Sequence, residues 1–499
     1  MKKINVILII FAILATLSCT KLDQSLRGET TQDDPNITAG GLLSSAYETL
    51  NSPYQAQDRL WCLTEHTTDE VVGPTRGGDW DDNGVWRVLH AHTWDADHSY
   101  AAATFKELLQ TQFAASLVLS KTTTPQQNAE ARFIRALSMF SVLDNWDQVP
   151  FRSDLVDLTK LPETKKGADC ANFIISELEA IVGNLPATGP AYKANRSAAN
   201  TLLMKLYLNK GVYGNRAAPT FAAADMSKVA ALADQITGYS LTPSYFQNFA
   251  PTNDALSSEN IYTLENAPGV KGGNIRSRWF MTTHYNQNPG GWNGFTTLSD
   301  FYDKFEATDK RIGQAYTGIT NVTGMRVGFL IGQQYDQNGV ALNGRNTPLI
   351  FTRNVALVES GNSLDVTGIR VVKYVPDITS TGDQKNNDYV IFRLGDVMLM
   401  KAEAILRGGT SASTALSIVN SLRAARTATP LAAVTLDNVL DERGRELYWE
   451  GWRRNDLVRF GKFLAPWQLK AASGSQRLLF AIPAEQLALN PNLKQNPGY

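Results

Sequence analysis

The sequence predicts a mainly α-helical fold: a tetratricopeptide-like scaffold of paired helices with a large loop-rich insertion that carries short strands. Apolar residues recur at the three- and four-residue steps of an α-helix in long segments at both ends of the chain. Between about residues 241 and 390 this period is lost, and Gly, Asn, Thr and Pro become frequent. A long irregular stretch of this kind is typical of a functional insertion on a scaffold.

Helices are expected on both sides of the insertion. In the segment 125–145, Phe133, Leu137 and Phe140 recur at helical spacing, and the segment 195–211 ends near a glycine. The complete set of expected helices is 41–50, 100–119, 125–145, 168–185, 195–211, 222–237, 392–407, 411–426 and 436–460. Short β-like runs at 327–331 and 369–375 are the expected strands of the insertion.

The amino terminus predicts export. Lys2 and Lys3 precede an apolar run over 4–17, and Cys19 follows it directly. This pattern indicates a signal peptide over 1–18, cleavage before Cys19 and acylation of that cysteine, with plain secretion as the alternative. Each buried acyl methylene would contribute about 0.8 kcal/mol to holding the protein on a membrane surface.

Four further regions complete the expected organisation of the chain. They are a lipidated tether at 19–36, an N-terminal helical region at 37–240, the insertion lobe at 241–390 and a C-terminal helical region at 391–499. Cys62 and Cys170 show no metal-ligand spacing and are expected to be buried free thiols.

The charge composition of the chain argues against one class of partner, nucleic acid. The formal net charge is −1, and Lys and Arg do not gather in a patch or tail. Because nucleic-acid binding relies on a basic surface, a nucleic-acid partner is not expected. The 10 Trp, 17 Tyr and 20 Phe provide aromatic surface for the core and for a ligand site.

Two loops have the composition of a sugar-binding site, TRGGDWDDNGVWR at 75–87 and HYNQNPGGWNGF at 284–295. Sugar rings present apolar faces and a rim of hydroxyls, which aromatic rings, carboxylates, amides and arginine can bind. We expect the two loops to converge, with Trp80 and Trp292 as platforms and Trp86 as a buried anchor. The candidate ligand-binding residues are Arg76, Asp79, Trp80, Asp81, Asn83, Tyr285, Trp292 and Asn293.

A calcium site is a minority alternative for the first loop. Asp79, Asp81, Asn83 and Gly84 match the early positions of a calcium-binding loop, but His90 stands where a bidentate glutamate is needed. No cofactor is therefore expected.

Catalysis is a second alternative. Glycosidases need a pair of carboxylates, and the sequence offers material for one in Glu65, Asp69, Glu70 and the loop aspartates. No nucleophile elbow, phosphate loop or dinucleotide fingerprint accompanies them, so a non-catalytic protein is expected.

Charged residues crowd the segment 442–459. They are Glu442, Arg443, Arg445, Glu446, Glu450, Arg453, Arg454, Asp456 and Arg459. Their spacing allows local pairs such as Glu442 with the arginines next to Glu446, and Glu450 with Arg453 or Arg454. The segment is therefore expected to form a solvated or interhelical salt-bridge ladder, with a partner-docking face as the alternative. Arg132, Arg135 and Glu403 are likewise expected to pair between helices.

Five segments carry a family resemblance. They are the lipoprotein start, AEARFIRALSMFSVLDNWDQVPF (129–151), RLGDVMLMKAEAILRGG (393–409), LDERGRELYWEGWRRNDLVRFGKF (440–463) and AIPAEQLALNPNLKQNPGY (481–499). Together and in this order they resemble the SusD/RagB family of outer-membrane nutrient-binding lipoproteins.

The resemblance implies a lipid-anchored protein on the external face of the cell outer membrane. It implies binding of an oligosaccharide or polysaccharide without catalysis, and delivery to a SusC-like TonB-dependent transporter. A peptide ligand, a glycan-degrading surface enzyme and a purely structural scaffold remain the alternatives.

Overall fold

The computed structural model describes most of the chain. The residues outside the description are 1–36, 154, 156 and 158. The predicted signal peptide (1–18), the lipidation site at Cys19 and the tether (19–36) therefore lie outside the described residues. Residues Ala39–Tyr499 form one unit.

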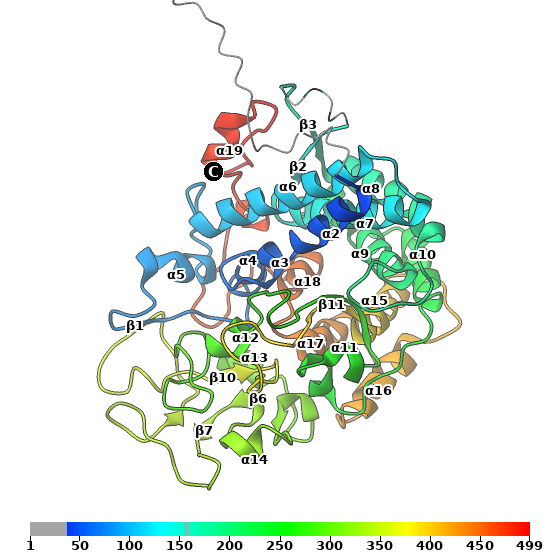
Figure 1. The fold of residues 1–499 in the computed structure, drawn as a ribbon. Coiled ribbons are helices and arrows are strands. Elements are labelled where there is room, and N and C mark those ends of the chain that lie inside the picture. The colour runs from blue at the N-terminus through cyan, green and yellow to red at the C-terminus, as the bar shows by residue number, and fades with distance from the viewer. Residues whose placement is uncertain (1–36, 154, 156, 158) are drawn as a thin grey trace, which may run out of the picture. The chain divides into compact units, whose positions relative to one another are not determined.

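Helices on both sides of the insertion make up most of this unit, as Figure 1 shows. Before the insertion they are α2 (Ala39–Glu48), α3 (Asn51–Gln55), α4 (Leu60–Glu65), α5 (Val85–His90), α6 (Ser99–Leu119), α7 (Pro125–Trp146), α8 (Gly167–Ile181), α9 (Arg196–Gly214) and α10 (Ala223–Asp234). After it they are α15 (Leu394–Leu406), α16 (Ala415–Ala425), α17 (Leu436–Leu447), α18 (Arg453–Arg459) and α19 (Ala484–Leu489). The predicted mainly helical fold class is confirmed.

The long helices stack in the order in which they occur along the chain. α6 packs on α7, α7 on α8, α8 on α9 and α9 on α10. α10 then packs on α15, which follows the insertion, and α15 in turn packs on α16 and α17. The helix stack is therefore continuous across the insertion, so the insertion projects from a single scaffold.

Helix α7 illustrates how local sequence sets a helix boundary. Thr124 and Gln127 form a reciprocal capping box at its start, and Pro125 occupies the first turn, where no backbone donor is needed. At its end Asp147 adopts a left-handed conformation with φ 67°, which terminates the helix.

The insertion contains four short helices and several two- or three-stranded sheets among the described residues. The helices are α11 (Asn253–Leu256), α12 (Ser277–Phe280), α13 (Ser299–Tyr302) and α14 (Thr320–Thr323). The strands of the insertion and its flanks are β1 (Thr75–Arg76), β2 (Gln148–Phe151), β3 (Glu163–Lys166), β4 (Asn260–Leu264), β5 (Gly313–Gln314), β6 (Val327–Leu330), β7 (Gly332–Gln333), β8 (Ile350–Phe351), β9 (Val358–Glu359), β10 (Arg370–Val372) and β11 (Tyr389–Arg393). The strands predicted at 327–331 and 369–375 are β6 and β10, which pair antiparallel with each other.

Two of the predicted helices differ from the structure. Phe392 and Arg393 end strand β11, which pairs with β4, so helix α15 begins at Leu394. The segment expected as one helix at 436–460 is two helices, α17 and α18. Between them Trp449 and Gly451 adopt left-handed conformations, with φ 62° and 85°.

Buried carboxylates far away in the sequence explain that break. Glu70 accepts a hydrogen bond from the backbone N–H of Trp449 at 3.0 Å, and Glu65 accepts one from the N–H of Gly451. A continuous helix would commit those N–H groups to its own carbonyls, and the two carboxylates would lose a donor each. The carboxyl-terminal tail contains the short helix α19.

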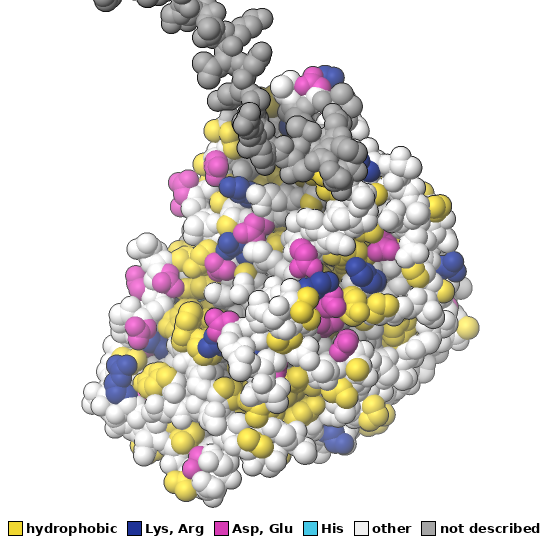
Figure 2. All heavy atoms as spheres, in the orientation of Figure 1, with side chains coloured by type: hydrophobic (Ala, Val, Ile, Leu, Met, Phe, Trp, Pro, Cys, Tyr) yellow, Lys and Arg dark blue, Asp and Glu magenta, His cyan; other side chains and the backbone are white. Residues whose placement is uncertain are grey.

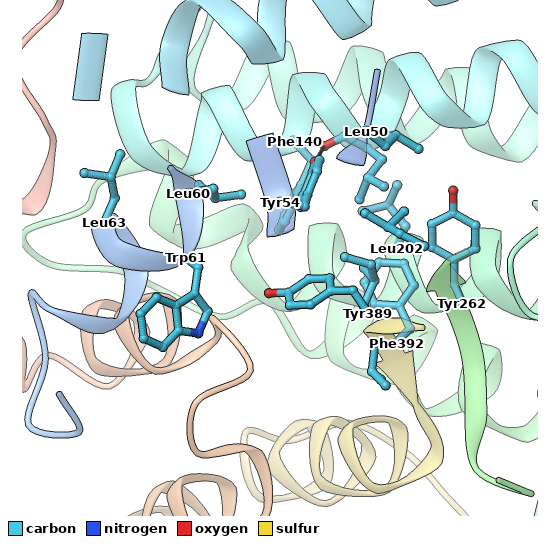
Figure 3. Packing of buried hydrophobic residues seen from close by; sticks show 14 of the residues in the cluster. Leu50, Tyr54, Leu60, Trp61, Leu63, Phe140, Leu202, Tyr262, Tyr389 and Phe392 are labelled. Carbon is cyan, nitrogen blue, oxygen red and sulfur yellow. Dashed lines mark hydrogen bonds between the residues drawn. The ribbon is translucent and has the colours of Figure 1, made fainter. Parts of the chain in front are cut away.

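The hydrophobic core joins the first helices to the strand that precedes α15 (Figure 3). Tyr54 of α3, Trp61 of α4 and Phe140 of α7 lie close to Tyr389 and Phe392 of β11 in this view, and all five are buried. Full burial of a large apolar side chain stabilises the fold by about 1.5–3 kcal/mol. The core therefore holds together segments from opposite ends of the sequence.

The charged segment 442–459 lies inside the protein. The guanidinium of Arg393 contacts Glu446 at 2.5 Å and Glu450 at 2.6 Å, and all three side chains are at most 2% exposed. Arg426 contacts the carboxylate of Glu446 at 2.8 Å. Burial excludes the alternative of a partner-docking face for these side chains. They form an ion-pair network between helices in the interior instead of a solvated one.

Only part of the predicted pairing within this network is present. Glu442 contacts Arg445, three residues along the chain, at 2.7 Å as predicted. Glu450 pairs with Lys373 and Arg393 from the insertion and β11 instead of with Arg453 or Arg454. Arg453 pairs with Asp69, across the molecule, at 2.7 Å. The break between α17 and α18 explains the difference, because it removes the helical register that a local pair requires.

Other predicted pairs and thiols are confirmed. Arg132 and Arg135 of α7 both contact Glu177 of α8, and Glu403 of α15 pairs with Arg459 of α18. The two described cysteines are buried free thiols.

The surface shows no single basic region on the face seen in Figure 2, where Lys and Arg side chains are scattered among Asp and Glu. In the part of the chain that the structure describes, none of the helices combines the length and apolar character needed to cross a bilayer.

Candidate functional site

The two Trp- and Gly-containing loops lie side by side. The indole Nε1–H of Trp80 donates a hydrogen bond to the backbone carbonyl of Trp292 at 2.9 Å, across 212 residues of sequence. The centroids of the two rings are 6.3 Å apart, and their planes are tilted by 56°. The rings thus form a corner with two walls instead of one flat platform.

Trp80 is held by close packing over a glycine. Its own backbone is left-handed, with φ 61°. A Cβ atom at Gly294 would lie 2.5 Å from two carbons of the Trp80 ring, so only glycine lets the ring lie so close to that backbone. The ring of Phe295 supports Trp80 from beneath at 5.0 Å between centroids.

Trp292 presents much of its ring to solvent. Its side chain is 59% exposed, while the ring of Phe280 packs against it at 5.2 Å between centroids. A Cβ at the preceding Gly291 would lie 2.2 Å from the hydroxyl of Thr283, so the tight turn requires glycine. An exposed indole on a closely packed turn is a surface on which an apolar face can stack.

A hollow of about 440 Å³ opens beside these rings. Its lining residues are Asp79, Trp80, Asp82, Tyr285, Gly291 and Trp292. This volume lies within the range of ligand sites in proteins. Aromatic walls with carboxylates and a phenol at the edge can bind a molecule that has both apolar faces and hydroxyl groups.

Two of the predicted ligand residues have structural contacts instead. Arg76 is 3% exposed and donates hydrogen bonds to the carbonyls of Leu364 and Thr367. Burial lowers its pKa to about 10. Asn293 is 5% exposed and bonds to the carbonyl of Asp365 at 2.9 Å. Both side chains fasten the loops from behind, so we remove them from the set of contact residues.

The aspartates of the first loop divide between two roles. Asp81 pairs with Arg87 at 2.7 Å, and Asn83 lies in an exposed turn; neither lines the hollow. Asp82 of the same loop does line it and accepts a hydrogen bond from the indole of Trp86 at 2.8 Å. The four-residue spacing from Asp82 to Trp86 at a helix start was the signal for this contact. Trp86 itself is 2% exposed, as expected for an anchor.

Tyr285 forms the other edge of the hollow and is part of a buried polar cluster. Its ring stacks on His284 at 3.8 Å between centroids, and its hydroxyl lies 3.4 Å from Asp365 Oδ2. The same oxygen faces His284 Nε2 at 3.3 Å and accepts the backbone N–H of Arg345 at 2.8 Å. Asp365 therefore joins two segments of the insertion, and no local sequence pattern pointed to it.

The aspartates of the calcium-like pattern belong to no cluster of candidate metal ligands within the described part of the chain. Among the described residues, no three His, Cys, Asp or Glu side chains lie close enough to hold a metal ion. His90, at the twelfth position of the pattern, is buried with its ring nitrogens near the carbonyls of Val71 and Gln468.

Three of the carboxylates considered for catalysis have structural contacts away from the hollow. Glu65 and Glu70 are at most 1% exposed, and burial raises the pKa of Glu70 to about 7. Asp69 pairs with Arg453 at 2.7 Å. None of the three lines the hollow.

We expect the free energy of unfolding to depend on pH because of His284, whose ring lies against that of Tyr285. His284 Nδ1 accepts the N–H of Asn286 at 3.0 Å, so the buried ring is neutral with its proton on Nε2. Burial lowers the pKa of His284 to about 4. The unfolded chain binds this proton near pH 6.5, so the contribution to stability is complete above that pH and is lost as the pH falls toward 4.

Comparison of the wild type with His284→Asn isolates this contribution. Between pH 7 and pH 5 the free energy of unfolding of the variant should fall by about 1–2 kcal/mol less than that of the wild type. Urea denaturation at both pH values measures the difference. Equal falls in the two proteins would show that His284 is not held neutral.

Solved structures share this fold. A SusD superfamily protein from Parabacteroides distasonis superposes with a TM-score of 0.71 at 18% identity, covering 94% of this chain and 100% of that one. A laminarin binding SusD-like protein gives 0.70 at 20% identity, covering 92% and 99%. The surface glycan-binding protein A from Bacteroides thetaiotaomicron, solved with laminarihexaose, gives 0.70 at 17% identity, covering 92% and 98%. The helix stack with its insertion is thus a SusD-like fold.

Sequence comparison finds similarity to the SusD family. A model of the SusD family matches residues 233–476. The starch-binding protein SusD of Bacteroides thetaiotaomicron is 27% identical over 415 residues, covering 75% of this chain and 73% of that protein. The SusD-like protein P25 of Formosa agariphila is 24% identical over 409 residues, covering 74% and 73%. The chain is therefore similar in sequence to the SusD family, both in the matched segment and over most of its length.

Proposed function

We propose that this protein binds a glycan in the hollow beside Trp80 and Trp292. The observation that carries the proposal is the corner of two tryptophan rings, one of them largely exposed, with the carboxylates of Asp79 and Asp82 at its edge. The rings bind the apolar face of a sugar, and the carboxylates accept hydrogen bonds from its hydroxyls. A starch-binding relative and two glycan-binding structural neighbours support this ligand class.

The cellular setting is part of the same proposal. The amino-terminal pattern supports a lipoprotein acylated at Cys19 that is displayed on the outer membrane, facing outside. The family resemblance supports delivery of the captured glycan to a SusC-like TonB-dependent transporter. In this setting the protein binds and transfers its ligand without cleaving it.

A binding screen of the purified full chain tests the ligand class. The panel contains laminarin, starch, their hexasaccharides and a set of peptides, and calorimetric titration measures binding. If the proposal is correct, at least one glycan binds saturably and the protein releases no shorter saccharides from it. Peptide binding without glycan binding, or accumulation of cleavage products, would refute it.

Removal of divalent metal should leave the protein unchanged. No carboxylate cluster among the described residues is built to hold calcium. EDTA is therefore expected to change neither the Tm nor the affinity for the glycan found in the screen. A lower Tm that calcium restores, with magnesium as the control, would instead assign a metal to the protein.

A further inference from the structure

A turn of the insertion forms an additional wall beside the hollow. The backbone N–H of Gly344 donates to the carbonyl of Thr347 at 2.8 Å, which closes a tight turn over 344–347. The N–H of Arg345 in this turn donates to Asp365 Oδ2. A Cβ at Gly344 would lie 2.8 Å from the same oxygen, so the turn fits closely onto Asp365.

The turn is also attached directly to the loop that carries Tyr285. The amide of Asn286 donates to the carbonyl of Asn343 at 2.8 Å. Together with Asp365, this bond fixes the turn relative to Tyr285, which lines the hollow. The position of the turn is therefore set by the site itself.

Arg345 projects from this turn beside Tyr285, with which its guanidinium interacts. Its side chain is exposed, and its guanidinium carbon lies 5.9 Å from the centre of the Tyr285 ring. Arg345 takes part in none of the ion pairs among the described residues, whereas the exposed Arg353 of the same insertion pairs with Asp303. A guanidinium has five N–H donors, so besides its interaction with Tyr285 it has further donors that can bind a ligand beside the hollow.

The charges around the hollow limit what that ligand can be. Asp79 and Asp82 line it, and neither has a cationic partner among the described ion pairs. Two uncompensated carboxylates repel an anionic ligand in the hollow. The guanidinium of Arg345 can instead donate two parallel hydrogen bonds to neighbouring hydroxyls of an uncharged sugar.

We propose that Arg345 is a specificity-determining residue that binds a second part of a neutral oligosaccharide, beyond the sugar held by Trp80 and Trp292. The inference rests on the proposed glycan-binding function and adds a requirement for chain length. A disaccharide fills the hollow only, whereas a hexasaccharide also reaches past Tyr285 to Arg345.

Variants of the full chain test this requirement with defined probes. Laminaribiose and laminarihexaose, and in parallel maltose and maltohexaose, are titrated against the wild type, Arg345→Ala and Arg345→Lys. Arg345→Ala should weaken hexasaccharide binding about tenfold and leave disaccharide binding unchanged. Arg345→Lys should recover little, because lysine lacks the planar fork.

Control variants separate this inference from the function on which it rests. Arg353→Ala removes an exposed arginine that pairs with Asp303 and should bind both lengths as the wild type does. Trp292→Ala should weaken binding of both lengths. Suppose that Trp292→Ala weakens glycan binding but Arg345→Ala has no effect, or weakens binding of the disaccharide and the hexasaccharide equally. The inference about Arg345 would then be wrong, while the proposed glycan-binding function would stand. Absence of binding by the wild type to all four saccharides would overturn the inference together with a laminarin- or starch-type ligand.

Discussion

Replacing Arg393 with methionine is expected to lower the free energy of unfolding by about 3–5 kcal/mol. The guanidinium of Arg393 contacts both Glu446 and Glu450 in a part of the core that is at most 2% exposed. Removing it leaves buried carboxylates with fewer cationic partners, and a buried unpaired charge is far more costly than the pair itself is favourable. Urea denaturation of the wild type and the variant measures the change.

An exposed ion pair provides the matched control. Arg353 and Asp303 also contact each other, but their side chains are 45% and 57% exposed. Arg353→Met should leave the free energy of unfolding nearly unchanged, since solvent screens the pair. If both variants lost the same small amount, the interior network would not be a determinant of the fold.

Replacing Trp292 with alanine is expected to weaken glycan binding by about 10- to 100-fold, which follows from the loss of aromatic stacking and apolar contact area. The Tm should change little, because the side chain is 59% exposed in the absence of ligand. Calorimetric titration with the glycan identified in the screen gives the affinity, and thermal unfolding gives the Tm.

Two further substitutions make that result specific. Trp292→Phe retains an aromatic face and should recover part of the affinity. Trp86→Ala removes a side chain that is 2% exposed and should lower stability by about 3–5 kcal/mol. Unchanged affinity in Trp292→Ala would remove this ring from the binding surface.

Local periodicity predicted the long helices because the apolar spacing of an amphipathic helix is written within each segment. Helix α7, with its capping box at Thr124 and Gln127, begins at the predicted residue and ends one residue past the predicted end. The single helix expected at 436–460 was wrong because its break is stabilised by Glu65 and Glu70, which lie far away in the sequence. Local patterns do not contain such contacts.

The same distinction between local patterns and distant contacts applies to the candidate glycan-binding site. Composition drew attention to both loops, and the placement of Trp80 and Trp292 at one hollow follows from their glycine-rich surroundings. Arg76 was assigned to the ligand on residue type alone, whereas its burial depends on distant carbonyls. Asp365 and Arg345 were missed because their role arises only when separate segments of the insertion meet.

The most direct test of glycan binding at this hollow is a crystal structure of the protein with laminarihexaose or with the tightest-binding glycan of the screen. We expect this structure to show one sugar ring stacked on Trp292 in the corner formed with Trp80, with its hydroxyls hydrogen-bonded to Asp79 or Asp82. A glycan bound at another surface, with the hollow empty, would contradict it.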